Sequence, residues 1–484
     1  MRRPERTVLA GLLALALAGC ALAPPYQPPA VPVAAAYQGP WQPAQPADQL
    51  PREGWWRLYA EPELDRLQQE LLRGNTDLAA AYAHYRQAAA YTAQARAGLF
   101  PQISLGADAE RNRQSDTKPL RGATSPSYYD AYTVDAQLDY EIDVWGRVRA
   151  AVEAGRDEEL ASAADLAAVR LSLQATLADD YLQLRGLDQQ LDLLRQSTDA
   201  YAKALELTRS RHQGGIASGL DVARAQTQLD AVRSQLAQVE AQRALMQHAI
   251  AVLVGQSPSR FSLAAATRAP APPAIPPAVP STLLERRPDI AAAERRVAAA
   301  NARIGVARAA YFPSLSLSAV GGWQSDRWGD LVSAPNRFWA IGPGLVFDLF
   351  DGGRRKAEVA AAKAATDEAA ARYRGVVLAA FAQVEDELSL LDRLGSASAQ
   401  QHAAAEAAQH ALDLAMDRYR AGAVGYLDVV QAQTAALDAK RSALDLDTRR
   451  LSASVRLMRA LGGGWQAGPD YGRAVADGAA AGAR

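Results

Sequence analysis

Side chains able to do acid–base, nucleophilic or metal chemistry are few in this chain and show no catalytic pattern. The glycines around Gly214 lack the Lys-Ser/Thr pair that completes a phosphate-binding loop, and no Gly-x-Ser-x-Gly elbow is present. The histidines are scattered, without metal-ligand spacing, at His84, His212, His248, His402 and His410. We therefore expect no enzymatic activity, no metal ion and no cofactor.

Two aspartates stand out by their position. Asp221 and Asp428 each follow a glycine-containing turn and each lie at the start of a predicted long helix. An acidic residue there stabilises the positive end of the helix dipole by roughly 0.3–1 kcal/mol. If several chains surrounded a passage, symmetry copies of Asp428 would also form an acidic ring that attracts cations and closes it. The two roles are compatible.

The only cysteine lies at the end of an export signal. Three arginines precede an apolar run over residues 8–18, which ends in Leu17-Ala18-Gly19-Cys20. This pattern predicts a signal peptide over residues 1–19, too short to span a membrane as a helix. Leu-Ala-Gly-Cys resembles the bacterial lipobox, which implies cleavage before Cys20 and acylation of its thiol and new amino group. Ala21 follows, in place of the aspartate of inner-membrane retention.

Composition excludes some classes of function. Lys and Arg total 52 against 53 Asp and Glu, so there is no basic field for nucleic acid. Beyond the signal peptide, no apolar run of about 18 residues could cross a membrane as one helix. Residues 20–52 are rich in Pro, Ala and Gln, which predicts an extended tether to a lipid anchor.

Strand patterns occur between helical stretches. A helical pattern runs from Pro62 to Ala97 and is stopped by Phe100-Pro101. Residues 133–143 then alternate apolar and polar, and residues 102–109 do so more weakly, so we predict one hairpin within about 101–143. One face of this hairpin favours lipid or core, and the other favours water.

Two very long helices follow each predicted hairpin. No proline occurs between Gly146 and Pro258, and glycines near residue 214 mark a turn. A helix over 147–212 would span about 100 Å, far more than a globular helix and typical of a coiled coil or helical barrel. We therefore predict a component of a tube.

The chain contains an internal repeat. Phe100-Pro101 is echoed by Phe312-Pro313 at an offset of 212, and Leu220-Asp221-Val222 by Leu427-Asp428-Val429 at an offset of 207. The predicted organisation is a first repeat at 53–265, a Pro-rich crossing at 266–280, a second repeat at 281–465 and a flexible tail at 466–484.

The second repeat adds two more strands, within about 313–349. Leu315, Leu317 and Ala319 alternate with serines, and the partner strand is predicted to carry Trp339, Ile341, Leu345, Phe347 and Leu349 on one face. Four strands leave two open sheet edges, and lipid cannot form hydrogen bonds with the backbone groups there. Closing a barrel therefore requires several chains. The following aromatic residues lie at predicted strand ends or loops, as in a membrane girdle: Tyr128, Tyr129, Tyr132, Trp323, Trp328, Phe338 and Trp339.

With these motifs the sequence resembles the outer-membrane factors of tripartite multidrug efflux systems, the TolC-like proteins, especially their OprM-like lipoprotein subgroup. The resemblance covers nearly the whole mature chain. It is carried by Leu283-Leu284-Glu285-Arg286-Arg287-Pro288-Asp289-Ile290, Asp143-Val144-Trp145-Gly146-Arg147, Arg418-Tyr419-Arg420, Tyr426-Leu427-Asp428 and Ala460-Leu461-Gly462-Gly463-Gly464-Trp465. We read Arg286 and Arg287 as ties between a helix start and nearby carboxylates, the alternative being an anion site.

The resemblance implies a mainly α fold with a small β part. Three chains would give four strands each to a twelve-stranded transmembrane barrel in the outer membrane, with a long periplasmic helical tunnel. It implies a periplasmic adaptor near residues 211–221 and 418–428, and an inner-membrane pump of the resistance-nodulation-division type. It also implies a periplasmic gate in which Tyr419 and Asp428 match family positions. Asp221, which holds the equivalent position to Asp428 in the first repeat, is a third candidate gate residue.

This sequence departs from the family pattern at the gate. Val424 replaces a gating arginine found in TolC, and Gln431 replaces an aspartate one turn after Asp428. The function expected is a passive channel for drugs or other small toxic compounds, opened by untwisting of the helix tip. Two alternatives are a type I secretion channel and a lipid-anchored periplasmic coiled-coil scaffold, whose strands would pack in a soluble domain.

Overall fold

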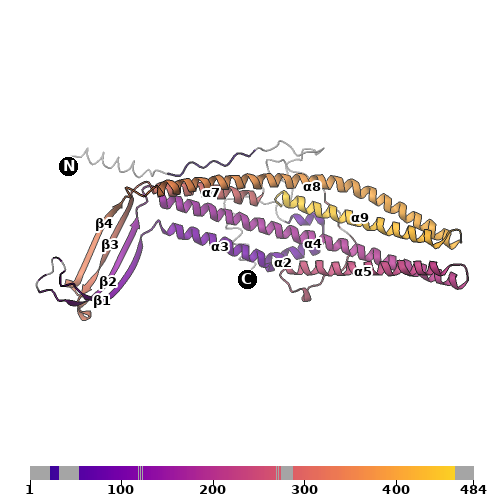
Figure 1. Cartoon of the computed structure of the whole chain (residues 1–484), viewed down its shortest axis with the longest axis horizontal. Coiled ribbons are helices and arrows are strands. Elements are labelled where there is room, and N and C mark those ends of the chain that lie inside the picture. Colours follow the sequence, from indigo (N-terminus) through magenta and orange to yellow (C-terminus); the bar gives the residue numbers. More distant parts are fainter. Residues whose placement is uncertain are drawn as a thin grey trace. The chain divides into compact units, whose positions relative to one another are not determined.

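We describe the protein from a computed structural model (Figure 1). It describes residues 22–31 and 54–463, apart from 118, 120–121, 123, 267, 269, 271 and 274–286. The predicted signal peptide, Cys20, most of the tether, Arg286 and the tail at 466–484 lie outside these residues. Contacts divide the chain into two compact units. A sheet unit contains residues up to 29, 86–161 and 293–373, and a hairpin unit contains 30–85, 162–292 and 374–484.

Helices make up most of the described chain, as the sequence predicted. The α-helices are α2 (Pro62–Gly74), α3 (Thr76–Ala97), α4 (Arg147–Gln213), α5 (Gly219–Leu253), α7 (Pro288–Ala309), α8 (Arg354–Arg420) and α9 (Tyr426–Ala460), and the short 3-10 helices are η2 (Trp55–Tyr59), η3 (Pro258–Arg260), η4 (Trp328–Asp330) and η5 (Ala334–Asn336). None of the helices in the described ranges is both long and apolar enough to cross a membrane.

The internal repeat is visible in the helix lengths. α4 and α8 have 67 residues each, α5 and α9 have 35 each, and α3 and α7 have 22 each. In the sheet unit the two long helices also begin alike, because Arg147 pairs with Glu141 and Arg354 with Asp348, each six residues earlier. The two copies therefore fold on one plan.

One helical stretch is divided where the sequence predicted continuity. The pattern from Pro62 to Ala97 breaks at Asn75, which has extended backbone angles. Its side-chain Oδ1 accepts a hydrogen bond of 2.8 Å from the Leu78 backbone N–H, and its Nδ2 donates one of 2.8 Å to the Leu253 carbonyl oxygen. Asn75 thus caps α3 and attaches it to the end of α5.

The sheet unit contains one four-stranded antiparallel sheet. Its strands are β1 (Gln102–Arg113), β2 (Tyr128–Glu141), β3 (Ser314–Ser325) and β4 (Arg337–Val346), in the order β1-β2-β3-β4 (Figure 1). The four strands and the β1–β2 hairpin were predicted from sequence, and this is confirmed. In the described part of the chain, β1 and β4 each have one strand neighbour.

Two predicted strand ends were wrong, because pairing in the sheet ends several residues before α4 and α8 begin. Phe347 and Leu349 follow the end of β4, where the Asp351 carboxylate caps α8 by accepting hydrogen bonds from the Gly353 and Arg355 N–H groups. Likewise β2 ends at Glu141, because Asp143 accepts hydrogen bonds from the first N–H groups of α4. A capping carboxylate stabilises the helix start at the expense of the last strand residues.

The register aligns apolar side chains across all four strands. Ile103 lies opposite Leu138, Leu138 opposite Ala319, and Ala319 opposite Ile341. On the edge strands these side chains are strongly exposed, with exposed fractions of 69% for Ile103 and 64% for Ile341. The rows on the opposite face carry Gln102, Asp139 and Ser318. The sheet therefore has one apolar face and one polar face.

Both repeats meet where the sheet joins its helices. The Trp145 ring stacks on the Phe312 ring, with 4.7 Å between centroids, and the Trp145 indole N–H donates a hydrogen bond of 2.8 Å to the Pro313 carbonyl oxygen. Gly146 has a φ of 76°, which glycine adopts without strain, so the chain turns directly from β2 into α4. Two motifs singled out in the sequence thus form one junction.

The main core of the hairpin unit surrounds α2. This short helix and η2 pack against α4, α5 and α9 through a cluster of buried apolar side chains. Burial at helical spacing explains why the amphipathic α2 forms. The largest fully buried members include Trp55, Leu64, Leu67, Leu71, Tyr181 and Ile250.

Candidate functional site

Two equivalent turns end the long helices of the hairpin unit (Figure 1). In the first, Gly215 has a φ of 71° and the Ile216 N–H donates to the Arg211 carbonyl oxygen. In the second, Gly422 has a φ of 76° and the Ala423 N–H donates to the Arg418 carbonyl oxygen. A left-handed glycine is the usual end of a helix, so these glycines make turns and do not cradle a phosphate.

Tyr419 lies buried between the two turns. Only 4% of this residue is exposed, and its hydroxyl donates a hydrogen bond of 3.3 Å to Thr208 Oγ1 on α4. Its ring meets the Tyr426 ring edge to face, with 5.3 Å between centroids. The second repeat therefore contacts the first through a tyrosine that the sequence had selected.

Arg211 completes this contact from the first repeat. Its guanidinium carbon lies 4.6 Å from the centroid of the Tyr419 ring, and its Nη1 donates hydrogen bonds to the carbonyl oxygens of Tyr419 (2.5 Å) and Arg420 (3.4 Å). A cation on an aromatic face is worth about 0.5–2 kcal/mol, and the charged hydrogen bonds add to this. We call Thr208, Arg211, Tyr419 and Tyr426 the hairpin latch.

Tyr426 is almost fully buried in the latch, with 1% exposed. Burial, followed by the neighbouring Tyr419 and Asp221, raises the pKa of Tyr426 to about 12. The Gln433 side chain lies near the Tyr426 hydroxyl and lowers this pKa in part, but no described residue forms a hydrogen bond of normal geometry with that hydroxyl. Tyr426 therefore contributes packing at neutral pH and carries no charge.

Asp221 is placed as a helix cap. Its backbone N–H donates to Ser218 Oγ at 3.2 Å, and its carboxylate accepts from the Ser218 backbone N–H at 3.1 Å. This reciprocal pair is a capping box at the start of α5. Arg224 Nη1 lies 3.7 Å from the same carboxylate. The Asp221 carboxylate therefore lies at the N-terminus of α5, where a negative charge interacts favourably with the helix dipole.

Asp428 is exposed in the first turn of α9, and no hydrogen bond or ion pair joins it to another described residue. Its counterpart in the repeat, Asp221, is capped, so the two aspartates differ in environment. Val424 is partly buried against the apolar cluster that contains Tyr419 and Tyr426, and Gln431 is exposed. The chain alone brings Tyr419 into a contact network but leaves Asp428 open to solvent.

Sequence reasoning selected Tyr419 but missed Arg211, Thr208 and the packing role of Tyr426. A signal for Arg211 was present, because Arg211 to Gly215 echo Arg418 to Gly422 in the second repeat. The repeat identifies equivalent positions, but it cannot indicate that Arg211 reaches across to the other turn. Arg211 thus supplies a cation to the latch, whereas position 424 carries a valine.

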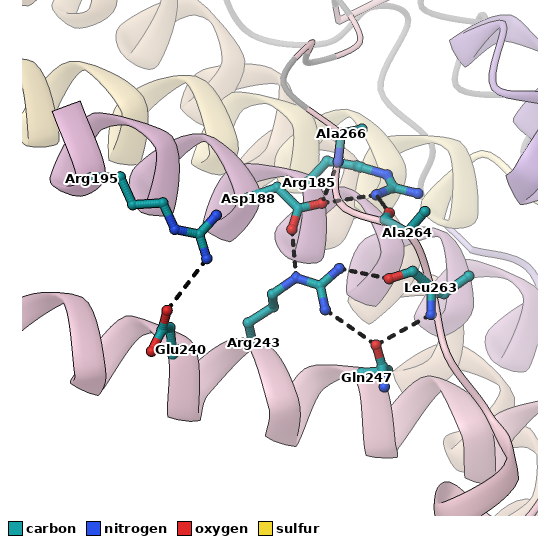
Figure 2. A network of polar contacts seen from close by, with 9 residues as sticks. All are labelled: Arg185, Asp188, Arg195, Glu240, Arg243, Gln247, Leu263, Ala264 and Ala266. Carbon is teal, nitrogen blue, oxygen red and sulfur yellow. Dashed lines mark hydrogen bonds and ion pairs between the residues drawn. The ribbon is translucent and has the colours of Figure 1, made fainter.

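A second polar network holds the chain where it leaves the first repeat. Figure 2 shows Asp188 of α4 between two arginines: Arg185 Nη1 is 2.8 Å from its carboxylate, and Arg243 Nε is 2.6 Å away. These arginines also donate hydrogen bonds of 2.8 Å to the carbonyl oxygens of Ala264 and Leu263. The Asp188 side chain is 1% exposed. The network fixes the segment that leads into the Pro-rich crossing.

The start of the second repeat is held similarly. Arg287 Nη2 lies 2.6 Å from the Asp289 carboxylate, and its Nη1 donates to Gln383 Oε1 (2.9 Å) and the Ala460 carbonyl oxygen (3.2 Å). For Arg287 the expected tie to a carboxylate at the helix start is confirmed. Among the described residues no group of three His, Cys, Asp or Glu side chains could hold a metal ion.

Comparisons with known proteins match almost the whole chain. The profile of a family described as outer membrane efflux protein matches residues 67–256 and 279–463. The pyoverdine export outer membrane protein OpmQ of Pseudomonas putida is 36% identical over 463 residues, which cover 94% of this chain and 97% of the relative. The outer membrane protein OprJ of Pseudomonas aeruginosa is 34% identical over 471 residues, 97% of this chain and 98% of OprJ.

Solved structures share the fold. A crystal structure of a membrane protein from Pseudomonas aeruginosa superposes with a TM-score of 0.86 at 32% identity, covering 93% of this chain and 99% of that chain. The outer-membrane channel OprN superposes with a TM-score of 0.83 at 31% identity, covering 93% of this chain and 100% of that chain. The β-hairpins and long helices described above are thus those of known outer-membrane channels.

Proposed function

Because the chain belongs to the outer membrane efflux protein family and is the outer-membrane channel of a tripartite efflux system, we propose that it conducts small toxic compounds passively and is closed by the hairpin latch. Channels of this family are homotrimers that work with an adaptor and an inner-membrane pump, and the family is not an enzyme family. These relatives favour an efflux channel over a periplasmic scaffold.

The observation that carries the proposal is the four-stranded sheet with one apolar face. Leu105, 84% exposed, and Trp339, 77% exposed, lie on the two edge strands. Such side chains favour lipid, and the outer edges of β1 and β4 need strand partners from other chains. Three chains would close a barrel of twelve strands, which agrees with the homotrimers of the family.

The proposed gate is the latch together with Asp428. Untwisting the pair α8–α9 away from α4–α5 would separate Arg211 from Tyr419, so the latch contacts oppose opening. Asp428, open to solvent in a single chain, would meet its symmetry copies near the passage and favour cations over anions. Asp221, which caps α5 and lies near Tyr426, would stabilise the same turn.

The proposed partners are a periplasmic adaptor at residues 211–221 and 418–428 and a pump of the resistance-nodulation-division type. The pump would supply the energy, since no nucleotide-binding motif is present in the sequence. We further propose that Cys20 is acylated and anchors the chain to the outer membrane. One relative is named for export of pyoverdine, which supports small organic molecules as the class of cargo.

A dye-efflux measurement tests the passive role. The chain is restored to its host after deletion of its gene, in one strain with the cognate pump and one without it. We expect the accumulated cationic dye to fall several-fold only where the pump is present. Extrusion that persists without the pump would contradict a passive channel.

A further inference from the structure

Residues 22–29, directly after the proposed lipidation site, lie along α7 in the sheet unit. Arg308 Nη1 donates a hydrogen bond of 3.1 Å to the Leu22 carbonyl oxygen, and Asn301 Nδ2 donates one of 2.8 Å to the Pro24 carbonyl oxygen. Further along, the Tyr26 hydroxyl lies 3.4 Å from the Glu294 carbonyl oxygen and 3.5 Å from its Oε1. We call residues 22–29 the N-terminal arm.

Gly305 lets the arm approach the helix backbone. A Cβ atom at Gly305 would lie 2.9 Å from Ala23 Cβ, a distance that real Cβ atoms hardly ever show, and 3.0 Å from the Ala23 backbone nitrogen. Burial and the Glu294 carboxylate raise the pKa of Tyr26 above its usual value. The contact residues Glu294, Asn301, Gly305 and Arg308 are spaced by seven, four and three, so they share one face of α7.

The internal repeat provides a built-in comparison. α3 is the first-repeat counterpart of α7, with the same length and an offset of 212. Arg308 has Arg96 as its counterpart, but Ala89 and Ala93 stand where α7 has Asn301 and Gly305. Arg308 therefore has an equivalent in both copies, whereas Asn301, which donates to the Pro24 carbonyl oxygen, and Gly305, which admits the arm, occur only in the copy that the arm crosses.

We propose that Glu294, Asn301, Gly305 and Arg308 form a seat that docks the N-terminal arm and fixes where the acylated Cys20 leaves the protein surface. The positioning role rests on the acylation proposed above. Cys20 lies two residues before Leu22, so it can be at most about 7 Å farther along the chain. Leu22 is held by Arg308, one residue before the end of α7 and six before the start of β3. The seat would thus place the acyl chains level with the start of the membrane strands.

The arm is suited to docking by its composition. Pro24-Pro25 and Pro28-Pro29 restrict the backbone before binding, so less conformational entropy is lost when the arm lies on α7. The arm runs antiparallel to α7, because Leu22 contacts its C-terminal end and Tyr26 contacts a residue one turn into the helix. This direction places Leu22, the first described residue of the arm, at the end of α7 that precedes the sheet.

Limited chymotrypsin cleavage after Tyr26 tests the seat in the full-length, detergent-extracted protein. We expect the wild-type arm to resist cleavage at least tenfold better than a free peptide of residues 20–31. Gly305→Leu and Ala23→Leu attack the same contact from its two sides, and each should raise the cleavage rate roughly tenfold. Gly375→Leu is the control, because a Cβ on that α8 glycine meets nothing within 4 Å.

Mass spectrometry of the N-terminal peptide reads the acylation separately. The proposal would be supported if the wild-type arm resists cleavage and Cys20 is acylated. In both seat variants the arm should then be cleaved faster while the trimer remains intact. An arm cleaved as fast as the free peptide, with Cys20 acylated, would overturn the seat. A protected arm with an unmodified Cys20 would overturn the anchor-positioning role, and dye efflux would still report the channel itself.

Discussion

The guanidinium of Arg211, at the end of α4, lies 4.6 Å over the ring of Tyr419, at the end of α8, and donates a hydrogen bond to its carbonyl oxygen. This contact breaks the symmetry of the internal repeat, because Arg211 is equivalent to Arg418 and Tyr419 to His212. One arginine of the first repeat therefore binds the turn of the second. In the gate proposed above, opening the tip would require the loss of this contact within a single chain.

The Tyr419 hydroxyl should stabilise the closed tip, whereas the Tyr426 hydroxyl should not. Tyr419→Phe removes the hydrogen bond to Thr208, worth about 1 kcal/mol, and should raise entry of a large hydrophilic antibiotic a few-fold. Tyr426→Phe removes a buried hydroxyl without a described partner and should leave entry unchanged. Antibiotic sensitivity of cells expressing each variant at equal levels measures this. Equal sensitivity of the two variants would count against the latch.

Asp188 should be a major determinant of stability. Asp188→Ala would leave Arg185 and Arg243 without their shared counterion, and breaking a buried ion pair from one side costs about 3–5 kcal/mol. The matched control is Glu240→Ala, whose partner Arg195 is 56% exposed and whose loss should cost about 1 kcal/mol or less. Thermal unfolding of the trimer at a fixed scan rate compares them. Similar midpoints would mean that the contacts of Asp188 with Arg185 and Arg243, drawn in Figure 2, are dispensable.

Asp180 should make stability depend on pH. Burial, followed by the neighbouring Asp179, raises the pKa of Asp180 to about 6, and its cavity of about 1100 Å³ is also lined by Asp438, Arg441, Asp445 and Arg449. A raised carboxyl pKa stabilises the folded state at low pH, and this contribution is lost as the pH rises from about 4 through 6.

Asp180→Asn should therefore raise the unfolding temperature at pH 7.5 and have little effect at pH 4. The measurement is thermal unfolding of wild type and variant at both values. If Asp180→Asn raises the unfolding temperature equally at pH 4 and pH 7.5, or lowers it at pH 7.5, ionisation of Asp180 does not destabilise the folded state.

The two faces of β1 should respond differently to charge. Leu105→Arg places a cation on the apolar face and should cost about 2–4 kcal/mol per chain if the residue lies near the bilayer midplane. Ser104→Arg puts the same side chain on the polar face and should insert normally. The yield of heat-modifiable, membrane-inserted protein measures this. Equal yields would contradict the assignment of the lipid-facing side.

Local patterns made most of the fold predictable. Period-two alternation revealed all four strands, and the absence of proline between Gly146 and Pro258 revealed α4 and α5. The Phe-Pro and Leu-Asp-Val motifs, which recur at offsets of 212 and 207, revealed the repeat. The errors occurred at Asn75, after Glu141 and after Val346, where a capping side chain outweighs the surrounding periodicity.

Long-range contacts could not be predicted in the same way. Tyr419 was selected from its motif, but its partner Arg211 is 208 residues away, and Asn301 binds a carbonyl group 277 residues away. Sequence spacing gives no distance between such residues. Asp428 remains a proposed gate residue, because its role depends on neighbouring chains and not on contacts within one chain.

Planar-bilayer conductance of purified wild-type trimers and of Arg211→Ala tests the central claim most directly. Arg209→Ala is the control, because among the described residues the Arg209 side chain bonds only to Gln226 of its own hairpin, at 2.8 Å. We predict a small, cation-selective wild-type conductance, a several-fold larger one for Arg211→Ala, and no change for Arg209→Ala. Trimers of wild type and Arg211→Ala that conduct equally would contradict closure by the latch, and the absence of any conductance would contradict the channel.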